Sequence, residues 1–301
     1  MKPDLVLRLS RIQQLPSVSP VAAKALEMIE LPNVTAGQLG AIIEQDQTLA
    51  ARLLQVANSP FYGFPRQIST IELAIVLLGF DTIKEIILTF LIQRFVSRFS
   101  SSLLDTYQFW QYSVFCGAAA RVFARYLGYR VAGEAFVTAL MHDIGILLLI
   151  SASPAEYQRV RSLQKIRLLP LPDAEFAVFE TTHAEVGGWL AQRWNLPETL
   201  ATAIEQHHHY PKPVELPPVI APNQIAHQLD HPLTVITALA EWAAAKLDRK
   251  QWAAEVRHPA LYIPDPLLTV LDLEHQLTTE ESTLRQEIQQ EYEKALAFLH
   301  T

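Results

Sequence analysis

The pair His142-Asp143 lies inside an apolar run that extends from Ala135 to Ile150. A buried polar side chain is costly unless it forms hydrogen bonds or binds a metal ion, so each member of the pair needs a partner. Successive residues of a helix lie about 100° apart, so one continuous helix could direct both side chains to a single centre. There they could hold a divalent cation that activates water. The alternative is a hydrogen-bonded pair that only ties helices together.

Three other groups of polar residues could complete such a centre. His183 lies near the start of a predicted helix, and the triplet His207-His208-His209 ends another. Glu241 lies in a helix that is otherwise apolar. Imidazole and carboxylate ligands together suit iron, manganese, zinc or nickel better than calcium.

Each of these groups also has a purely structural explanation. His183 could form a local hydrogen bond in the first turn of its helix. The histidine triplet lies where a partly positive side chain interacts favourably with the C-terminal end of a helix. Glu241 precedes Trp242 and could lie on a polar face.

The elements that must position these residues are predicted to be almost entirely helical. Apolar residues recur every three or four positions, and the alternation typical of strands is scarce. Capping-box spacings mark helix starts at Thr35 with Gln38 and at Thr182 with Glu185. The predicted helices cover about 20–31, 35–45, 46–57, 69–78, 81–99, 107–127, 131–150, 154–165, 182–194, 197–208, 231–247 and 279–299.

The polar sequence Ser100-Ser101-Ser102 is a plausible domain boundary. We therefore predict an N-terminal helical part over residues 1–104 and a second helical domain over residues 105–301. A proline-rich loop from Pro211 to Pro232 interrupts the second part, and an irregular stretch follows from about Lys250 to Leu277.

The composition excludes several classes of protein. The 301 residues contain 24 Lys and Arg against 31 Asp and Glu, a net charge of -7, and no dense basic stripe for general nucleic-acid binding. Cys116 is the only cysteine, which excludes an internal disulfide and a cysteine-based zinc motif and fits a reducing cytoplasm. The N-terminus is too polar for a signal peptide, and uncharged apolar stretches fall short of a bilayer. We predict a cytoplasmic protein that binds neither nucleic acid nor a membrane.

The motifs along the chain resemble those of the HDOD proteins, bacterial signalling proteins with an HD-related output domain. The resemblance extends from about Leu15 to Leu273. Its motifs in the first part are Leu15-Pro16-Ser17, Gln45-Asp46, Ala57 to Gly63, Ile68 to Thr70 and Ala74 to Gly79. Those in the second part are Phe109-Trp110, Met141 to Gly145, His183 to Gly187, Trp194 to Pro197 and Ala203 to His208.

This resemblance implies an all-α fold, in which an HD-domain-like helical bundle follows an N-terminal helical bundle. It also implies a metal site with the candidate ligands His142, Asp143, His183 and His207, and His208 as an alternative to His207. In an active enzyme, Asp143 would hold the metal and bridge to an activated water. The metal would be iron, manganese, zinc or nickel.

The pattern of the HD phosphohydrolases is nevertheless incomplete. The segment Trp110 to Ser113 resembles their Trp-x-His-Ser pattern, but Tyr112 replaces the first histidine. A phenol is mostly protonated at neutral pH and is a poor ligand. Glu241 is the nearest candidate for their last aspartate. Relatives that hydrolyse cyclic di-GMP have Lys where this chain has Ile146, and Tyr210-Pro211 lacks the glycine of their Gly-Tyr-Pro motif.

Three functions are compatible with this pattern. The first is a signalling module that acts through a protein partner, with the loop from Phe61 to Pro65 as one exposed contact or, alternatively, as an aromatic plug between helices. The second is a metal-dependent phosphohydrolase for a nucleotide or cyclic nucleotide, with Arg121 and Arg125 as possible phosphate contacts. The third is a sensor that binds a nucleotide without cleaving it. The missing histidine and lysine favour the first.

Overall fold

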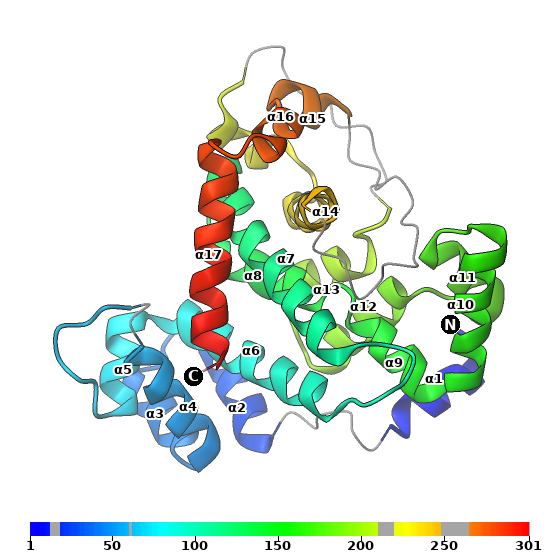
Figure 1. Cartoon of the computed structure of the whole chain (residues 1–301). Helices are drawn as coiled ribbons and strands as arrows, with labels where there is room; N and C mark the ends of the chain where they lie inside the picture. Colours follow the sequence, from blue (N-terminus) through cyan, green and yellow to red (C-terminus); the bar gives the residue numbers. More distant parts are fainter. Residues whose placement is uncertain (13–18, 60–61, 210–219, 248–264, 301) are drawn as a thin grey trace. The chain divides into compact units, whose positions relative to one another are not determined.

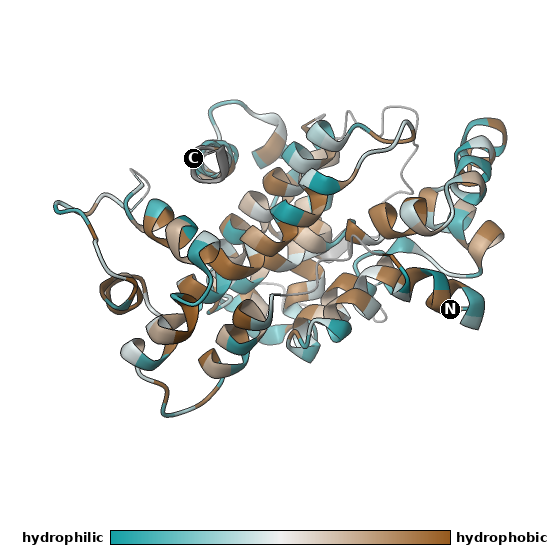
Figure 2. Cartoon of the chain, turned by 90° about the horizontal axis from the view of Figure 1, so that it is seen from below, coloured by the Kyte–Doolittle hydropathy of each residue, from teal (hydrophilic) through white to brown (hydrophobic). Residues whose placement is uncertain are grey.

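The computed structural model describes residues 1–12, 19–59, 62–209, 220–247 and 265–300. In these ranges the regular elements are seventeen α-helices and one 3-10 helix, without a strand (Figure 1). The prediction of an all-α protein is therefore confirmed. Figure 2 shows hydrophobic and hydrophilic residues on the same helices, as expected for helices that bury one face.

The chain divides into two compact units. Unit 1 comprises Met1–Gln13 and Phe99–Tyr292, and unit 2 comprises Gln14–Arg98 and Glu293–Thr301. These ranges differ from the predicted division at residue 104, because helix α1 (Pro3–Ser10) belongs to unit 1. Its buried Leu5 and Leu9 account for this, since α1 packs against helix α9 (Ile144–Ala152) of the same unit.

Unit 2 is a small helical bundle with an apolar interior. Its first five helices are α2 (Pro20–Ile29), α3 (Ala36–Ile43), α4 (Gln47–Ala57), α5 (Ile71–Leu78) and α6 (Phe80–Arg98). The predicted capping box at the start of α3 is present, with Thr35 and Gln38 each accepting a backbone N–H of the other. The interior is built from Leu, Ile and Ala side chains of all five helices.

Unit 1 contains the predicted site. Its remaining helices are α7 (Thr106–Leu127), α8 (Ala132–Met141), α9, α10 (Pro154–Arg167), α11 (Leu171–Phe179), α12 (His183–Arg193), α13 (Glu198–Glu205), η1 (Pro222–Gln228), α14 (Pro232–Lys246), α15 (Asp265–Val270) and α16 (Leu273–Thr278). Helix α17 (Thr283–His300) contributes residues to both units. Within unit 1, α7 packs against α8 and α14, and α12 packs against α9 and α13.

In the part of the chain that the structure describes, one segment, Ala132–Ala152, is long and apolar enough to cross a membrane by length and composition. An 18-residue window within it has a mean hydropathy of 1.9. In the structure 89% of that window is buried. It comprises α8, α9 and the junction between them, which form part of the interior of unit 1. Burial against other helices accounts for its apolar character.

Candidate metal centre

His142 and Asp143 lie at a junction between two helices. Helix α8 ends at Met141 and α9 begins at Ile144, so the prediction of one continuous helix over 131–150 is wrong. The junction is packed closely against α12, because a Cβ atom at Gly145 would lie 2.0 Å from the carbonyl oxygen of His183. The two side chains are therefore presented by the end of one helix and the start of the next.

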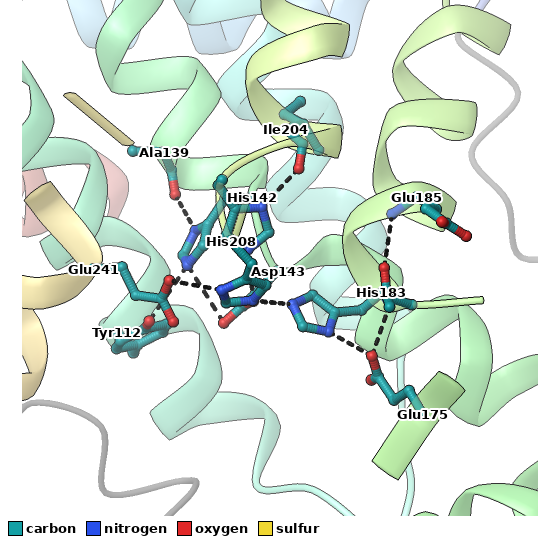
Figure 3. Close-up of polar contacts among 12 residues, drawn as sticks. Tyr112, Ala139, His142, Asp143, Glu175, His183, Glu185, Ile204, His208 and Glu241 are labelled. Atoms are coloured by element: carbon teal, nitrogen blue, oxygen red, sulfur yellow. Dashed lines mark hydrogen bonds and ion pairs between the residues drawn. The ribbon is translucent and has the colours of Figure 1, made fainter. Parts of the chain in front are cut away.

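Three of the four predicted ligands, His142, His183 and His207, lie around the carboxylate of the fourth, Asp143. Its Oδ1 lies 3.1 Å from Nε2 of His183 and 3.8 Å from Nε2 of His207. Its Oδ2 lies 3.4 Å from Nε2 of His142. His208 joins them, with its Nε2 2.9 Å from Nε2 of His183 (Figure 3). We call these five residues the Asp143 cluster.

Among the described residues, two sets of side chains each have ligand atoms that all lie within 4.8 Å of one another. One set is Asp143, His183, His207 and His208, and the other is His142, His207 and Glu241. Two ligands bound to one ion at about 2.1 Å in tetrahedral geometry lie about 3.4 Å apart. The distances of 3.1–3.8 Å from Asp143 to the histidines are therefore of the size that a shared ion requires.

The cluster lies in the interior of unit 1. Its side chains and that of Glu241 are only 0–4% exposed. Carboxylates buried this deeply are costly unless positive charge compensates them. A bound cation would supply that charge.

Hydrogen bonds to Nδ1 fix the orientation of three of the rings. Nδ1 of His142 lies 2.6 Å from the carbonyl oxygen of Ala139, and Nδ1 of His207 lies 2.6 Å from that of Ile204. Nδ1 of His183 lies 2.6 Å from a carboxylate oxygen of Glu175. Because these oxygens only accept, each Nδ1 carries a proton and each Nε2 is directed at Asp143.

The donor set fits a divalent transition metal. Nε2 of His207 and Nδ1 of His208 are buried without a hydrogen-bond partner in the described structure. A buried imidazole nitrogen of this kind is a natural ligand for iron, manganese, zinc or nickel. Asp143, His183, His207 and His208 form the group that would hold the ion, with His142 and Glu241 beside it.

The electrostatics of the cluster favour positive charge at His183. Burial lowers the pKa of His183, but the carboxylates of Glu175 and Asp143 together outweigh that effect and raise the pKa to about 10. For His208, burial and the neighbouring His207 hold the pKa well below its usual value. The site thus distinguishes two neighbouring histidines. Without an ion, His183 is favoured in the charged form and His208 in the neutral form; an ion held by Nε2 of His183 would take the place of the proton on that nitrogen.

Tyr112 occupies the position where the resemblance implies a histidine. Its hydroxyl lies 3.3 Å from Nε2 of His142. Burial, with added contributions from Cys116 and Glu241, raises the pKa of Tyr112 well above its usual value, so the phenol stays neutral. Since Nδ1 of His142 is protonated, the hydroxyl donates to Nε2 and engages the lone pair that would otherwise bind a metal.

Sequence reasoning missed Glu175. This carboxylate lies on α11, a helix that was not predicted, and it is fully buried. The preceding sequence Pro170-Leu171-Pro172 looks like a loop, although proline at the first turn also favours a helix start. The available signal was Glu175 itself, an acidic residue among the apolar residues Ala174, Phe176 and Ala177. A charged residue is rarely buried unless it is paired, so a buried Glu175 would indicate a partner.

Other predicted features lie away from the cluster. Arg121 and Arg125 form ion pairs with Glu291, at 3.3 and 3.0 Å, so the structure gives them a partner within the protein. In the loop that follows α4, Phe64 packs against the core of unit 2, and Phe61 lies outside the described residues. Leu15-Pro16-Ser17, Tyr210-Pro211 and most of the predicted irregular stretch also lie outside them.

A pocket of about 250 Å³ lies at the starts of α13 and α14. Glu198, Thr202, Asp230 and Thr234 are among the residues that line it, and none of its lining residues belongs to the Asp143 cluster. The pocket is therefore separate from the buried cluster.

Comparison with known proteins identifies a family for this chain. The model of the HDOD domain family matches residues 15–210. An uncharacterised protein of Treponema pallidum (strain Nichols) is 29% identical in an alignment 219 residues long, which covers 71% of this chain and 41% of that protein. The chain thus spans about two fifths of the length of this relative.

Three solved structures share the fold. An HDOD domain protein of unknown function from Geobacter sulfurreducens has a TM-score of 0.67 at 24% identity, covering 98% of this chain and 96% of that one. A provisionally named phosphohydrolase from Shewanella amazonensis SB2B has a TM-score of 0.68 at 20% identity, covering 99% and 97%. A provisionally named signal transduction protein from Marinobacter aquaeolei VT8 has a TM-score of 0.63 at 18% identity, covering 99% and 64%.

Proposed function

The chain belongs to the HDOD family, and from this premise we propose that it is a regulatory signalling module that acts through a protein partner. Its HD-type site binds a divalent transition metal but does not hydrolyse a nucleotide. One solved structure of this fold bears the name of a signal transduction protein and another that of a phosphohydrolase. Both functions, signalling and hydrolysis, have therefore been suggested for proteins with this fold.

The observation that carries the proposal is the contact between Tyr112 and His142. A neutral phenol replaces an imidazole ligand, and its hydroxyl engages Nε2 of His142 at 3.3 Å. Positions 112 and 142 are therefore both weaker metal ligands than in the ligand set of an active enzyme. Asp143, His183, His207 and His208 still form a group that can hold one ion.

Burial supports the same conclusion. A divalent ion, when bound, would act as a Lewis acid and lower the pKa of a coordinated water. Hydrolysis also requires that a phosphodiester reach that water. The side chains of the Asp143 cluster are at most 4% exposed, which suits an ion better than a nucleotide.

Elemental mass spectrometry of the purified protein tests the metal centre. We expect stoichiometric iron, manganese, zinc or nickel in the wild type and none in the His142→Ala Asp143→Ala double variant. Hydrolysis of cyclic di-GMP and of a chromogenic phosphodiester is measured on the same samples after reconstitution with each metal. We expect no turnover above the double variant.

The second candidate function is a metal-dependent phosphohydrolase. It is favoured by the four-residue ligand group around Asp143, which meets the first requirement of metal-assisted hydrolysis. Turnover by the wild type that disappears in the double variant would establish it and overturn the proposal. Tight nucleotide binding without turnover would instead identify a nucleotide sensor.

A further inference from the structure

Nδ1 of His142, His183 and His207 donates to two different kinds of acceptor. His142 follows the last residue of α8, and His207 lies just after α13. At the end of a helix the last carbonyl groups have no partner within the helix. Each of these rings therefore uses the carbonyl three residues earlier, that of Ala139 or Ile204.

His183 cannot use that solution, because it is the first residue of α12. The start of a helix offers free N–H groups and no free carbonyls, so an acceptor must come from elsewhere. Glu175 provides it from α11. One carboxylate oxygen, Oε2, accepts the backbone N–H of His183 at 2.8 Å and lies 2.6 Å from its Nδ1.

Glu175 is in turn held by α10. The hydroxyl of Tyr157 donates to its Oε1 at 3.3 Å, and both side chains are buried. Helices α10 and α11 pack against each other as a hairpin. The position of Glu175, the acceptor for His183, therefore depends on the position of this hairpin. The other two acceptors belong to the backbone immediately before their own histidines and have no such dependence.

From this geometry we infer that Glu175 is a positioning residue, which fixes Nε2 of His183 as the ligand atom and links metal binding to the α10–α11 hairpin. This inference rests on the metal centre of the proposed function. Carboxylates that orient ligand histidines in this way change metal affinity by about 10- to 100-fold when they are removed. Metal binding should therefore stabilise the position of the hairpin, and the hairpin in this position should raise the affinity for the metal.

The test measures the affinity for Zn²⁺ by competition with a chromogenic chelator, and the visible spectrum with Co²⁺. We expect Glu175→Ala to lower Zn²⁺ affinity by about 10- to 100-fold and to change the Co²⁺ spectrum. Glu175→Gln keeps an acceptor oxygen of the same size, so it should recover part of the affinity and serves if the alanine variant does not fold. Glu291→Gln is the matched control, since it alters a buried carboxylate that is paired with arginines outside the cluster.

Hydrogen exchange provides a readout that general destabilisation does not imitate. Addition of Zn²⁺ to the wild type and to Glu291→Gln should slow amide exchange in residues 154–180, and Glu175→Ala should lose this response. If both Glu175 variants keep wild-type affinity and spectrum, this inference is overturned while the metal centre stands. If the wild type binds neither Zn²⁺ nor Co²⁺, both proposals fail together.

Discussion

The interiors of the two units differ in whether they bury charged side chains. Unit 2 surrounds an apolar core of side chains such as Leu53 and Ile87, which are fully buried. Unit 1 has an apolar interior as well, but in its middle it buries Asp143, Glu175 and Glu241 beside histidines. Both units are helical, so the difference lies in the residues placed inside and not in the type of element.

This difference shows what each interior contributes. The core cluster of unit 2 consists of apolar side chains, and burial of apolar surface stabilises a fold without further chemistry. The cluster of unit 1 costs free energy through desolvation and is stable only when charges and hydrogen bonds are compensated. Stability of unit 2 should therefore depend on packing, and stability of unit 1 should depend also on what the cluster binds.

The largest expected effect is the creation of a cavity in unit 2. Leu53→Ala removes a fully buried side chain and should lower the free energy of unfolding by about 2–5 kcal/mol. Urea denaturation measures this loss, and metal content should stay unchanged. Leu73→Ala is the matched control, because Leu73 lies in the same unit but is 40% exposed. A similar loss in both variants would contradict the dependence of unit 2 on the packing of its buried core.

Metal removal should act on unit 1 alone. A ligand that binds only the folded state at 100 times its dissociation constant stabilises that state by about 2.7 kcal/mol. We expect a chelator to lower the unfolding midpoint of the wild type and to leave the His142→Ala Asp143→Ala variant unaffected. Calorimetry with and without a chelator measures this. Equal shifts in both proteins would show that the chelator acts outside the cluster.

Most of the fold could be predicted because local signals agreed with tertiary structure. The capping box of Thr35 with Gln38 marks the start of α3, and Thr182 caps α12 as its sequence predicts. Two features were hidden for physical reasons. Apolar periodicity continues through the junction at His142-Asp143, so the break between α8 and α9 was missed. Closely spaced prolines concealed the start of α11.

The candidate site could be predicted only as far as sequence motifs extend. His142, Asp143, His183 and His207 all belong to motifs, and the structure brings their side chains together. Glu175 belongs to no motif, and its role depends on the packing of α11 beside the first turn of α12. Such contacts arise from tertiary structure, and residue spacing along the chain does not record them.

Tyr112→His sharpens the comparison by adding a ligand to the polar interior. The new imidazole would stand where the phenol now engages His142, so we expect metal affinity to rise by about tenfold, or 1.4 kcal/mol. Tyr112→Phe separates the two effects, since it frees Nε2 of His142 without adding a ligand. Titration calorimetry with Zn²⁺ compares the three proteins. An affinity in Tyr112→His no higher than in Tyr112→Phe would show that position 112 lies outside the reach of the ion.

The smallest effect concerns an ion pair at the surface of unit 1. Arg8 lies 2.7 Å from Glu156, and its hydrogen bond, with a second from Ser153, lowers the pKa of Glu156. A lowered pKa in the folded state means that the contribution is present above the unfolded pKa and is lost as the pH falls through the folded value. Both side chains are over a third exposed, so solvent screening limits the contribution to less than about 1 kcal/mol. Urea denaturation between about pH 3 and pH 6 should show a slightly smaller acid loss in Glu156→Gln than in the wild type. A difference of several kcal/mol would mean that this surface pair behaves like the buried cluster.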